Sequence, residues 1–344
     1  MDASPSTSFI SRRINSSTFV IIEDDEYGEQ PYIYVKCYPK HLVITDTGCN
    51  CARSPKRSII SLQQYIETFP LSNEGNSILN PKGEKKYIII CSHCHYDHIL
   101  GISQFLPTEP IIIASEFDKS FILDDLPRNS LCKYNNIPTP EYTISHWAKH
   151  MEYFTLPGFS FRIQFLHIPG HTPDSLAWYD IDENHLYVGD TFYERKRLTP
   201  IPELPDDENQ DPGFLAAPGA IIFPEEGGDW IQYMSSLDLL LSFVLHQNAQ
   251  LRRGAGFAHT PIPRVKAGCG HLTYDADAEH MILEVRTLFE RIIAGTVSVT
   301  GSGEVRGVVH DYWLENEEAR FSVRAPRRLV EEAREHFHVK GEKD

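Results

Sequence analysis

The sequence predicts an α/β fold in which strands pack in layers and helices lie outside them. Over the first two-thirds of the 344 residues, short runs rich in Ile, Val, Tyr and Phe alternate with helical stretches, and turn residues separate the runs. Long amphipathic helical periodicity follows in the last third. No internal repeat or clear linker divides the chain, so we expect one domain over residues 9–338, with disordered tails at residues 1–8 and 339–344.

Eight segments have the β-branched and aromatic content of strands, with turn residues at their ends. They are residues 18–23, 32–37, 41–45, 87–91, 111–114, 161–166, 176–179 and 186–188. The fourth is almost wholly apolar, which is typical of a strand buried on both faces.

Three long helices are expected towards the C-terminus. Apolar residues recur with helical spacing over residues 281–293, and Gly295 ends the pattern as a residue just beyond a helix. A second helix covers residues 229–246, and a third covers residues 326–337. The stretch at about residues 195–230 is rich in Pro, Gly and acidic residues, which indicates a lid-like insertion.

Charge and composition narrow the classes of partner. The formal net charge of −16 disfavours DNA, RNA and anionic membranes, because binding to phosphate needs Lys and Arg. The longest apolar stretch, residues 237–245, is too short to span a bilayer, and residues 1–13 contain no signal-peptide core. Seven cysteines in a chain of this size favour reduced thiols. We therefore expect a cytoplasmic protein with a small-molecule substrate; its oligomeric state is left open, with a homodimer as one alternative.

A dense group of metal-ligating residue types follows the apolar strand at residues 87–91. His93, His95, Asp97 and His98 supply four such side chains within six residues. A strand that leads through a loop into a helix places that loop at the edge of the sheet, where α/β proteins hold their sites. A solvent-exposed loop has no need for such a group, so the cluster indicates a metal site.

Three further residues stand at the ends of expected strands. His171 lies in a Pro-Gly-His turn after residues 161–166, Asp190 ends a strand in Val-Gly-Asp, and His271 follows a Gly-Cys-Gly turn. Strand ends are rigid positions from which a ligand can be presented. Each of these three signals is weak when taken alone.

In their order along the chain, these motifs resemble those of the metallo-β-lactamase superfamily over about residues 18–295, and Asp46-Thr47-Gly48 resembles the family's first motif. The resemblance implies a four-layer αββα sandwich and a site with two metal ions. It implies these ligands: His93, His95 and His171 for the first ion, Asp97, His98 and His271 for the second, Asp190 bridging both, and Asp46 behind them to orient a ligand. Zinc suits these donors, with iron or manganese as alternatives.

Details within the superfamily point to a reaction class. Tyr193, three residues after the bridging aspartate, resembles the tyrosine with which the lactone-hydrolysing branch binds the substrate carbonyl. Residues 189–194, Gly-Asp-Thr-Phe-Tyr-Glu, also resemble fungal members that open lactams. The acidic insertion disfavours glutathione thioesters. The expected reaction is the opening of a small cyclic ester or amide, a lactone or γ-lactam, by attack of a metal-bridging hydroxide, with Asp97 relaying a proton. A thioesterase of the glyoxalase II type and a non-catalytic binding protein with the same fold remain alternatives.

Overall fold

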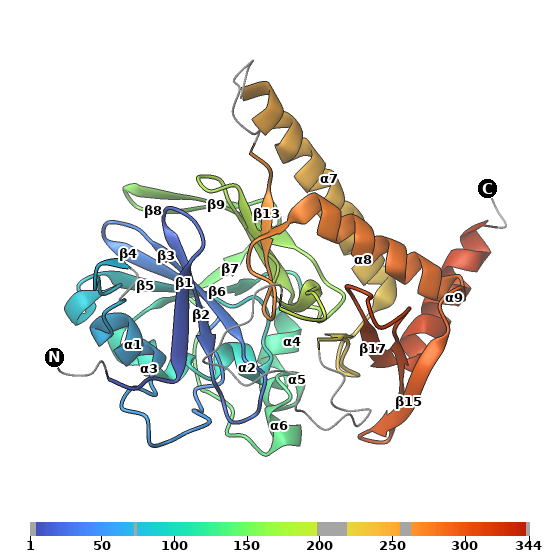
Figure 1. The fold of residues 1–344 in the computed structure, drawn as a ribbon, viewed down its shortest axis with the longest axis horizontal. Helices are drawn as coiled ribbons and strands as arrows, with labels where there is room; N and C mark the ends of the chain where they lie inside the picture. Colours follow the sequence, from blue (N-terminus) through green and yellow to red (C-terminus); the bar gives the residue numbers. More distant parts are fainter. Residues whose placement is uncertain (1–4, 72–73, 198–218, 255–262, 342–344) are drawn as a thin grey trace. The chain divides into compact units, whose positions relative to one another are not determined.

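The computed structural model describes residues 5–71, 74–197, 219–254 and 263–341, with side chains described up to residue 337. The chain forms two compact units, Met1–Lys149 and His150–Asp344 (Figure 1). The single domain expected over residues 9–338 stays a prediction.

The first unit is built on a seven-stranded sheet whose strands follow one another in chain order. The first four strands pair antiparallel, and β4 to β7 pair parallel. The strands are β1 (Phe9–Arg13), β2 (Thr18–Glu23), β3 (Tyr32–Cys37), β4 (His41–Thr45), β5 (Lys86–Ile90), β6 (Ile111–Ser115) and β7 (His146–Ala148).

Short helices connect these strands. They are α1 (Leu62–Thr68), η2 (Pro81–Gly83), α2 (Tyr96–Ile99), α3 (Ile102–Phe105), η3 (Leu106–Thr108), α4 (Lys119–Leu123), α5 (Leu126–Asn129) and α6 (Cys132–Asn135). One sheet face packs its alternate apolar residues against α1 and α3, with Ile66 and Phe105 fully buried. Ser61 caps α1 by accepting a hydrogen bond from the backbone N–H of Gln64. This packing fixes the strand ends from which the site residues follow.

The second unit contains a six-stranded sheet in the order β14-β13-β11-β10-β9-β8. All neighbours pair antiparallel except β11 and β13, which run parallel. The strands are β8 (Tyr153–Leu156), β9 (Phe159–His167), β10 (Leu176–Asp180), β11 (His185–Tyr187), β13 (Lys266–Gly268) and β14 (Ala276–Asp277), and η4 (Gly189–Thr191) follows β11.

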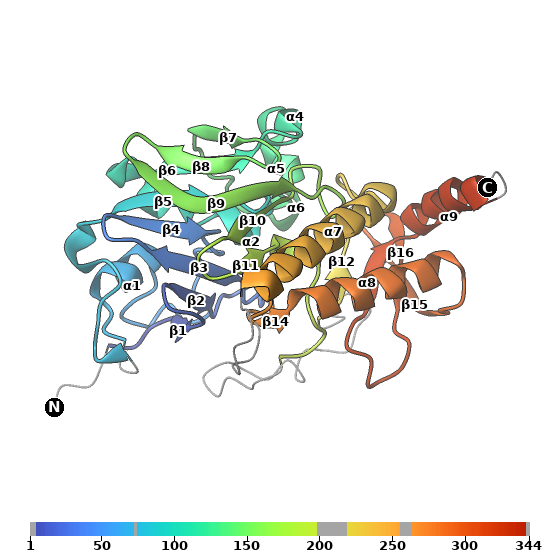
Figure 2. The ribbon, with the colours of Figure 1, turned by 90° about the horizontal axis from the view of Figure 1, so that it is seen from above.

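Helices α7 (Trp230–Gly254) and α8 (Ala278–Ile293) lie side by side in both ribbon views (Figure 2). The apolar stripe of α8 is buried with one face of the six-stranded sheet, because Val285 and Phe289 share a core with Leu166 and Ala177. Trp230, at the start of α7, is only 1% exposed in the same core.

The C-terminal part of this unit forms a small sheet in the order β12-β17-β16-β15. Its elements are β12 (Ile221–Ile222), β15 (Val299–Val305), β16 (Val308–Trp313) and β17 (Val323–Pro326), followed by α9 (Arg327–Gly341). Arg334 of α9 donates to the carbonyl oxygens of Ile292 and Ile293, so it satisfies the end of α8. These contacts join the C-terminal segment to the helices that cover the large sheet.

The predicted α/β fold class is confirmed, since each unit supplies a mixed sheet and helices. Three expected strands match in both bounds, namely β2, β3 and β4. Helix α2, which follows the strand and its loop, begins at Tyr96, so Asp97 and His98 lie in its first turn. Strands β15 to β17 were missed: Gly and charged residues interrupt their apolar pattern.

The ends of the chain also differ from the expectation in part. Ser8 is fully buried and its N–H donates to the carbonyl of Ile59, so ordered structure begins before residue 9. Helix α9 continues to Gly341, beyond the expected boundary at residue 338. Residues 1–4, 342–344 and 198–218, the last covering most of the expected lid, lie outside the described residues.

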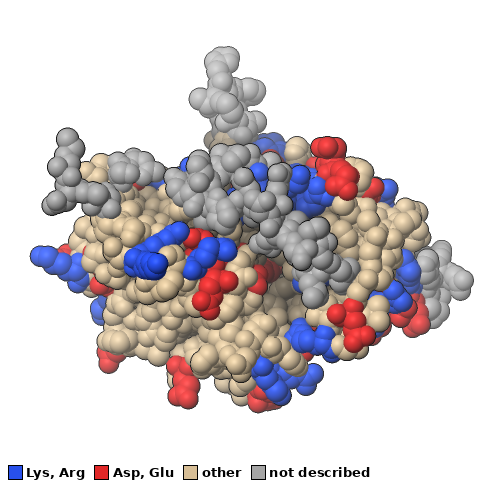
Figure 3. All heavy atoms as spheres, turned by 60° about the horizontal axis from the view of Figure 1, so that its bottom comes forward, with Lys and Arg blue, Asp and Glu red and all other residues tan. Residues whose placement is uncertain are grey.

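Charges of both signs are interspersed on the face drawn in Figure 3. Several charged side chains form ion pairs, such as Arg286 with Asp238 at 2.6 Å. Among the described residues, no helix combines the length and apolar character that crossing a bilayer requires.

Candidate metal centre

In the first unit, the carboxyl ends of two parallel strands carry the expected site residues. Thr45 at the end of β4 pairs in register with Ile90 at the end of β5. The segments that follow, Asp46 and residues 92–98, therefore leave the sheet at one edge. The backbone N–H of Asp46 donates to the carbonyl of Ile90 at 2.9 Å, which holds the two segments together.

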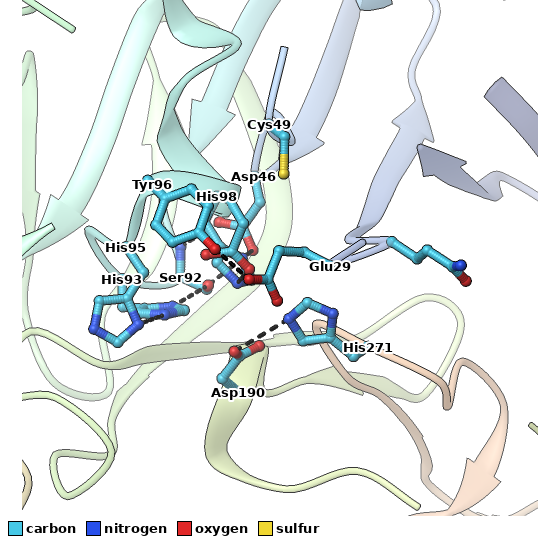
Figure 4. A network of polar contacts seen from close by, with 12 residues as sticks. Glu29, Asp46, Cys49, Ser92, His93, His95, Tyr96, His98, Asp190 and His271 are labelled. Carbon is cyan, nitrogen blue, oxygen red and sulfur yellow. Dashed lines mark hydrogen bonds and ion pairs between the residues drawn. The ribbon is translucent and has the colours of Figure 1, made fainter. Parts of the chain in front are cut away.

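Asp46 is a buried organising residue at this edge. It adopts a left-handed conformation with φ +60° and is 1% exposed. Its Oδ1 accepts from the backbone N–H of Ser92 at 2.7 Å, and its Oδ2 lies 2.8 Å from both Ser92 Oγ and His98 Nδ1. Asp46 therefore contacts His98 directly (Figure 4).

His93 and His95 turn their ring nitrogens towards each other. Nε2 of His93 and Nδ1 of His95 lie 2.9 Å apart, and both rings are buried. Two nitrogens on one tetrahedral zinc ion stand about 3.3 Å apart when each bond is about 2.0–2.1 Å. Ser92 Oγ lies 3.0 Å from His93 Nδ1. A proton on Nδ1 of His93 would point at this hydroxyl and would leave the ring's lone pair on Nε2, the nitrogen that faces His95.

Asp97 and His98 lie in the first turn of α2. Oδ2 of Asp97 is 3.1 Å from Nε2 of His98, while Nδ1 of His98 contacts Asp46. Cys94 faces the other way and packs with Ala114 and Ile122. Burial and the charge of Glu29 raise the pKa of Tyr96, whose hydroxyl donates to that carboxylate.

In the second unit, the other three expected ligands also share one sheet edge. Strands β9, β11 and β13 run in the same direction, since β9 and β11 each pair antiparallel with β10 and β13 pairs parallel with β11. His171, Asp190 and His271 each come three or four residues after the carboxyl end of one of these strands. The topology therefore gathers them at one edge.

The Pro-Gly-His turn is held against the start of α7. Gly170 has φ +143°, and a Cβ at this position would lie 2.5 Å from Cα of Tyr233. The carbonyl of Gly170 accepts from the N–H of Asp229 at 2.9 Å. His171 Nδ1 lies 2.8 Å from the carbonyl oxygen of Ile222 in β12. The other ring nitrogen, Nε2, is then the candidate metal-ligating atom.

Asp190 and His271 face each other, with Oδ2 and Nε2 3.3 Å apart (Figure 4). The ring of Tyr193 stands edge-on to His271 at a centroid distance of 5.4 Å. Burial, followed by the charges of Glu194 and Asp190, raises the pKa of the Cys269 thiol. That cysteine is therefore a protonated core residue and no nucleophile.

The donor set fits divalent metal ions. All seven expected ligands are buried His or Asp, and imidazole with carboxylate suits zinc, iron or manganese. Rings whose far nitrogen binds a carbonyl, carboxylate or hydroxyl are typical of metal-ligating histidines. The chain thus carries candidate metal-binding residues in each unit.

Some residues around these ligands had no role in the sequence interpretation. Ser92 contacts both Asp46 and His93. Glu194, although within the Gly-Asp-Thr-Phe-Tyr-Glu motif, was given no role, and it proves to be a buried carboxylate.

Comparison with known proteins gives one family. The model of the metallo-beta-lactamase superfamily matches residues 27–244. A protein of Aspergillus versicolor named "Putative transcription factor avaE" is 31% identical over 301 residues, which is 86% of this chain and 80% of that protein. His271 lies beyond the segment matched by the family model.

Two solved structures are similar to this chain at low sequence identity. BJP-1, a subclass B3 metallo-β-lactamase of Bradyrhizobium japonicum, is 15% identical with a TM-score of 0.48, over 85% of this chain and 96% of its own. FEZ-1 from Legionella gormanii is 16% identical with a TM-score of 0.46, over 86% of this chain and 99% of its own.

Proposed function

Because the chain belongs to the metallo-β-lactamase superfamily, we propose that it is a dinuclear metal-dependent hydrolase that opens a small lactone or γ-lactam ring. Three histidines would hold one ion, two histidines and an aspartate would hold the other, and a further aspartate would serve both. The residues are His93, His95 and His171, then Asp97, His98 and His271, and finally Asp190.

The single observation that carries this proposal is how the histidine rings are held. Nδ1 of His93 lies against a hydroxyl, that of His98 against a carboxylate, and that of His171 against a backbone carbonyl, at 2.8–3.0 Å. Each contact leaves Nε2 as the nitrogen for an ion. Histidines that served only for packing would not need a polar partner on Nδ1 in all three rings.

Zinc, or iron or manganese in its place, would act as a Lewis acid and lower the pKa of water at the site to about 7. The chain's own residues would do the rest. The Tyr193 hydroxyl would donate a hydrogen bond to the carbonyl oxygen of the substrate, where negative charge develops. Asp97 would hold the proton that passes to the leaving alkoxide or amide nitrogen. The ring contact between Tyr193 and His271 supports the first assignment.

The first test measures metal content and turnover together. His95→Ala and Asp190→Ala should each lose bound metal by elemental analysis and lose hydrolysis of lactone and γ-lactam substrates. His246→Ala, an exposed histidine on α7, is the matched control and should retain both. Full activity in either ligand variant would contradict the two-metal assignment.

A substrate panel separates the reaction classes. Tyr193→Phe should slow the opening of a lactone or γ-lactam by about 100- to 1000-fold while metal content stays the same, as expected for the loss of one oxyanion donor. An unchanged rate would remove Tyr193 from the site. Thioesters belong in the same panel, and a preference for them would replace ring opening by a thioesterase of the glyoxalase II type.

A small molecule is the partner that we propose, although the Aspergillus relative is named a transcription factor. The net charge of −16 opposes binding to nucleic acid phosphates. Binding of random duplex DNA at about 0.15 M salt, by a protein without hydrolytic activity or bound metal, would favour a non-catalytic role for the same fold.

A further inference from the structure

We propose that Glu194 is a positioning residue that sets the distance between the loops carrying Asp190 and His271. Arg320, from the C-terminal segment, holds Glu194 in place. This inference rests on the proposed function, because the two loops would supply ligands of the second metal ion. It extends the site to a part of the chain that lies outside the segment matched by the family model.

Two hydrogen bonds join the loops through Thr273. The backbone N–H of Glu194 donates to Thr273 Oγ1 at 3.0 Å, and that hydroxyl donates to Glu194 Oε2, also at 3.0 Å. A backbone bond from Gly270 N–H to the carbonyl of Gly189 at 2.7 Å runs alongside them. Asp190 and His271 lie between these anchors, so the anchors fix their separation.

The turn that presents His271 is strained and needs such an anchor. The N–H of Thr273 donates to the carbonyl of His271 at 2.5 Å, and Leu272 between them has φ +56°. This is a γ-turn in its rarer form, and a branched side chain at positive φ persists only where the surroundings hold it. The contacts of Glu194 with Thr273 supply that support directly beside the ligand.

Arg320 satisfies the other oxygen of this carboxylate. Its Nε lies 2.6 Å from Glu194 Oε1, and its Nη1 lies 2.7 Å from Glu284 of α8. The carbonyl of Arg320 also accepts from the N–H of Arg195 at 2.8 Å. Glu194 is only 2% exposed, and a carboxylate buried so deeply requires a charged partner. Arg320 therefore holds one oxygen of the Glu194 carboxylate while the other faces Thr273.

The probes are Zn²⁺ and Co²⁺ alone, added to the full chain after a chelator has removed bound metal. Glu194→Gln keeps the size of the side chain but loses its charge and one acceptor oxygen. We expect its affinity for the second equivalent of metal to fall about 10- to 100-fold, with the first equivalent unaffected. The absorption spectrum of the second Co²⁺ should shift, which a change in stability alone does not produce.

Thr273→Val provides an independent variant, because it removes only the hydroxyl from a side chain of similar size. It should show the same selective loss, and the double variant with Glu194→Gln should lose little more, since both act through one contact. Arg320→Gln should weaken the second site too, and Arg320→Lys should restore most of that loss.

Arg327→Gln is the matched control. Arg327 pairs at 2.7 Å with Asp311, a buried carboxylate in the same unit, and its hydrogen bonds within the described part of the chain go to Asp311 and Ser302. The Arg327→Gln substitution should lower the melting temperature without changing the affinity for metal. Unchanged binding and Co²⁺ spectra in both Glu194→Gln and Thr273→Val would overturn the positioning role and leave the proposed function intact. A wild-type protein that takes up no metal would overturn the proposed function and this role with it.

Discussion

Replacing Gly170 by alanine tests how closely the His171 turn packs on α7. The added Cβ would lie 2.5 Å from both Cα and Cβ of Tyr233 and 2.7 Å from its backbone nitrogen. Because these are mainly backbone atoms, the turn or the helix must move. We expect overpacking to lower the free energy of unfolding by about 1–3 kcal/mol. The strained φ of +143° should lower it by about 1–3 kcal/mol more.

Gly158→Ala is the matched control for this change. Gly158 also has a positive φ, +77°, but no atom lies within 4 Å of the Cβ position, so it measures the backbone strain alone. Thermal unfolding should show a larger loss for Gly170→Ala, by about 2–4 °C for each additional kcal/mol. Zinc affinity should fall in Gly170→Ala only, since His171 moves with the turn. Equal melting temperatures and equal zinc affinities for the two variants would refute the close packing.

Three further outcomes follow from the same structure. Burial, and then the charge of Asp25, raises the pKa of Glu23 from its ordinary 4.5 to about 8, so the folded protein holds a proton that the unfolded chain releases. The free energy of unfolding should therefore decrease between about pH 5 and pH 8, and Glu23→Gln should flatten this slope in denaturant titrations; equal slopes would contradict the assignment. Gly101→Ala should destabilise the loop that contains Asp46, because the Cβ of the new alanine would lie 2.1 Å from the carbonyl oxygen of Thr47. An unchanged melting temperature would contradict this close contact. Removal of metal by a chelator should lower the melting temperature, because binding to the folded state stabilises it. For metal at 1,000 times its Kd, this stabilisation is about 4 kcal/mol in the free energy of unfolding.

Local patterns were enough to place many of the elements that carry the site. Strands β2 to β4 could be predicted because they are short runs of β-branched and aromatic residues bounded by turn residues. The helix around residues 281–293 could be predicted because its apolar residues recur with helical spacing. The ligand-type residues were equally visible, since His93, His95, Asp97 and His98 stand within six residues. Strands β15 to β17 lack such a pattern, and their pairing depends on neighbours elsewhere in the chain.

The sequence by itself determined which side chains can ligate a metal and which strands carry them, because both depend on residue type and short-range spacing. Only the tertiary structure decided how those side chains are held. Glu194 meets Thr273 across 79 positions and Arg320 across 126, and Asp46 meets His98 across 52. Contacts over such separations arise from strand register and helix packing, which no local repeat in the sequence records.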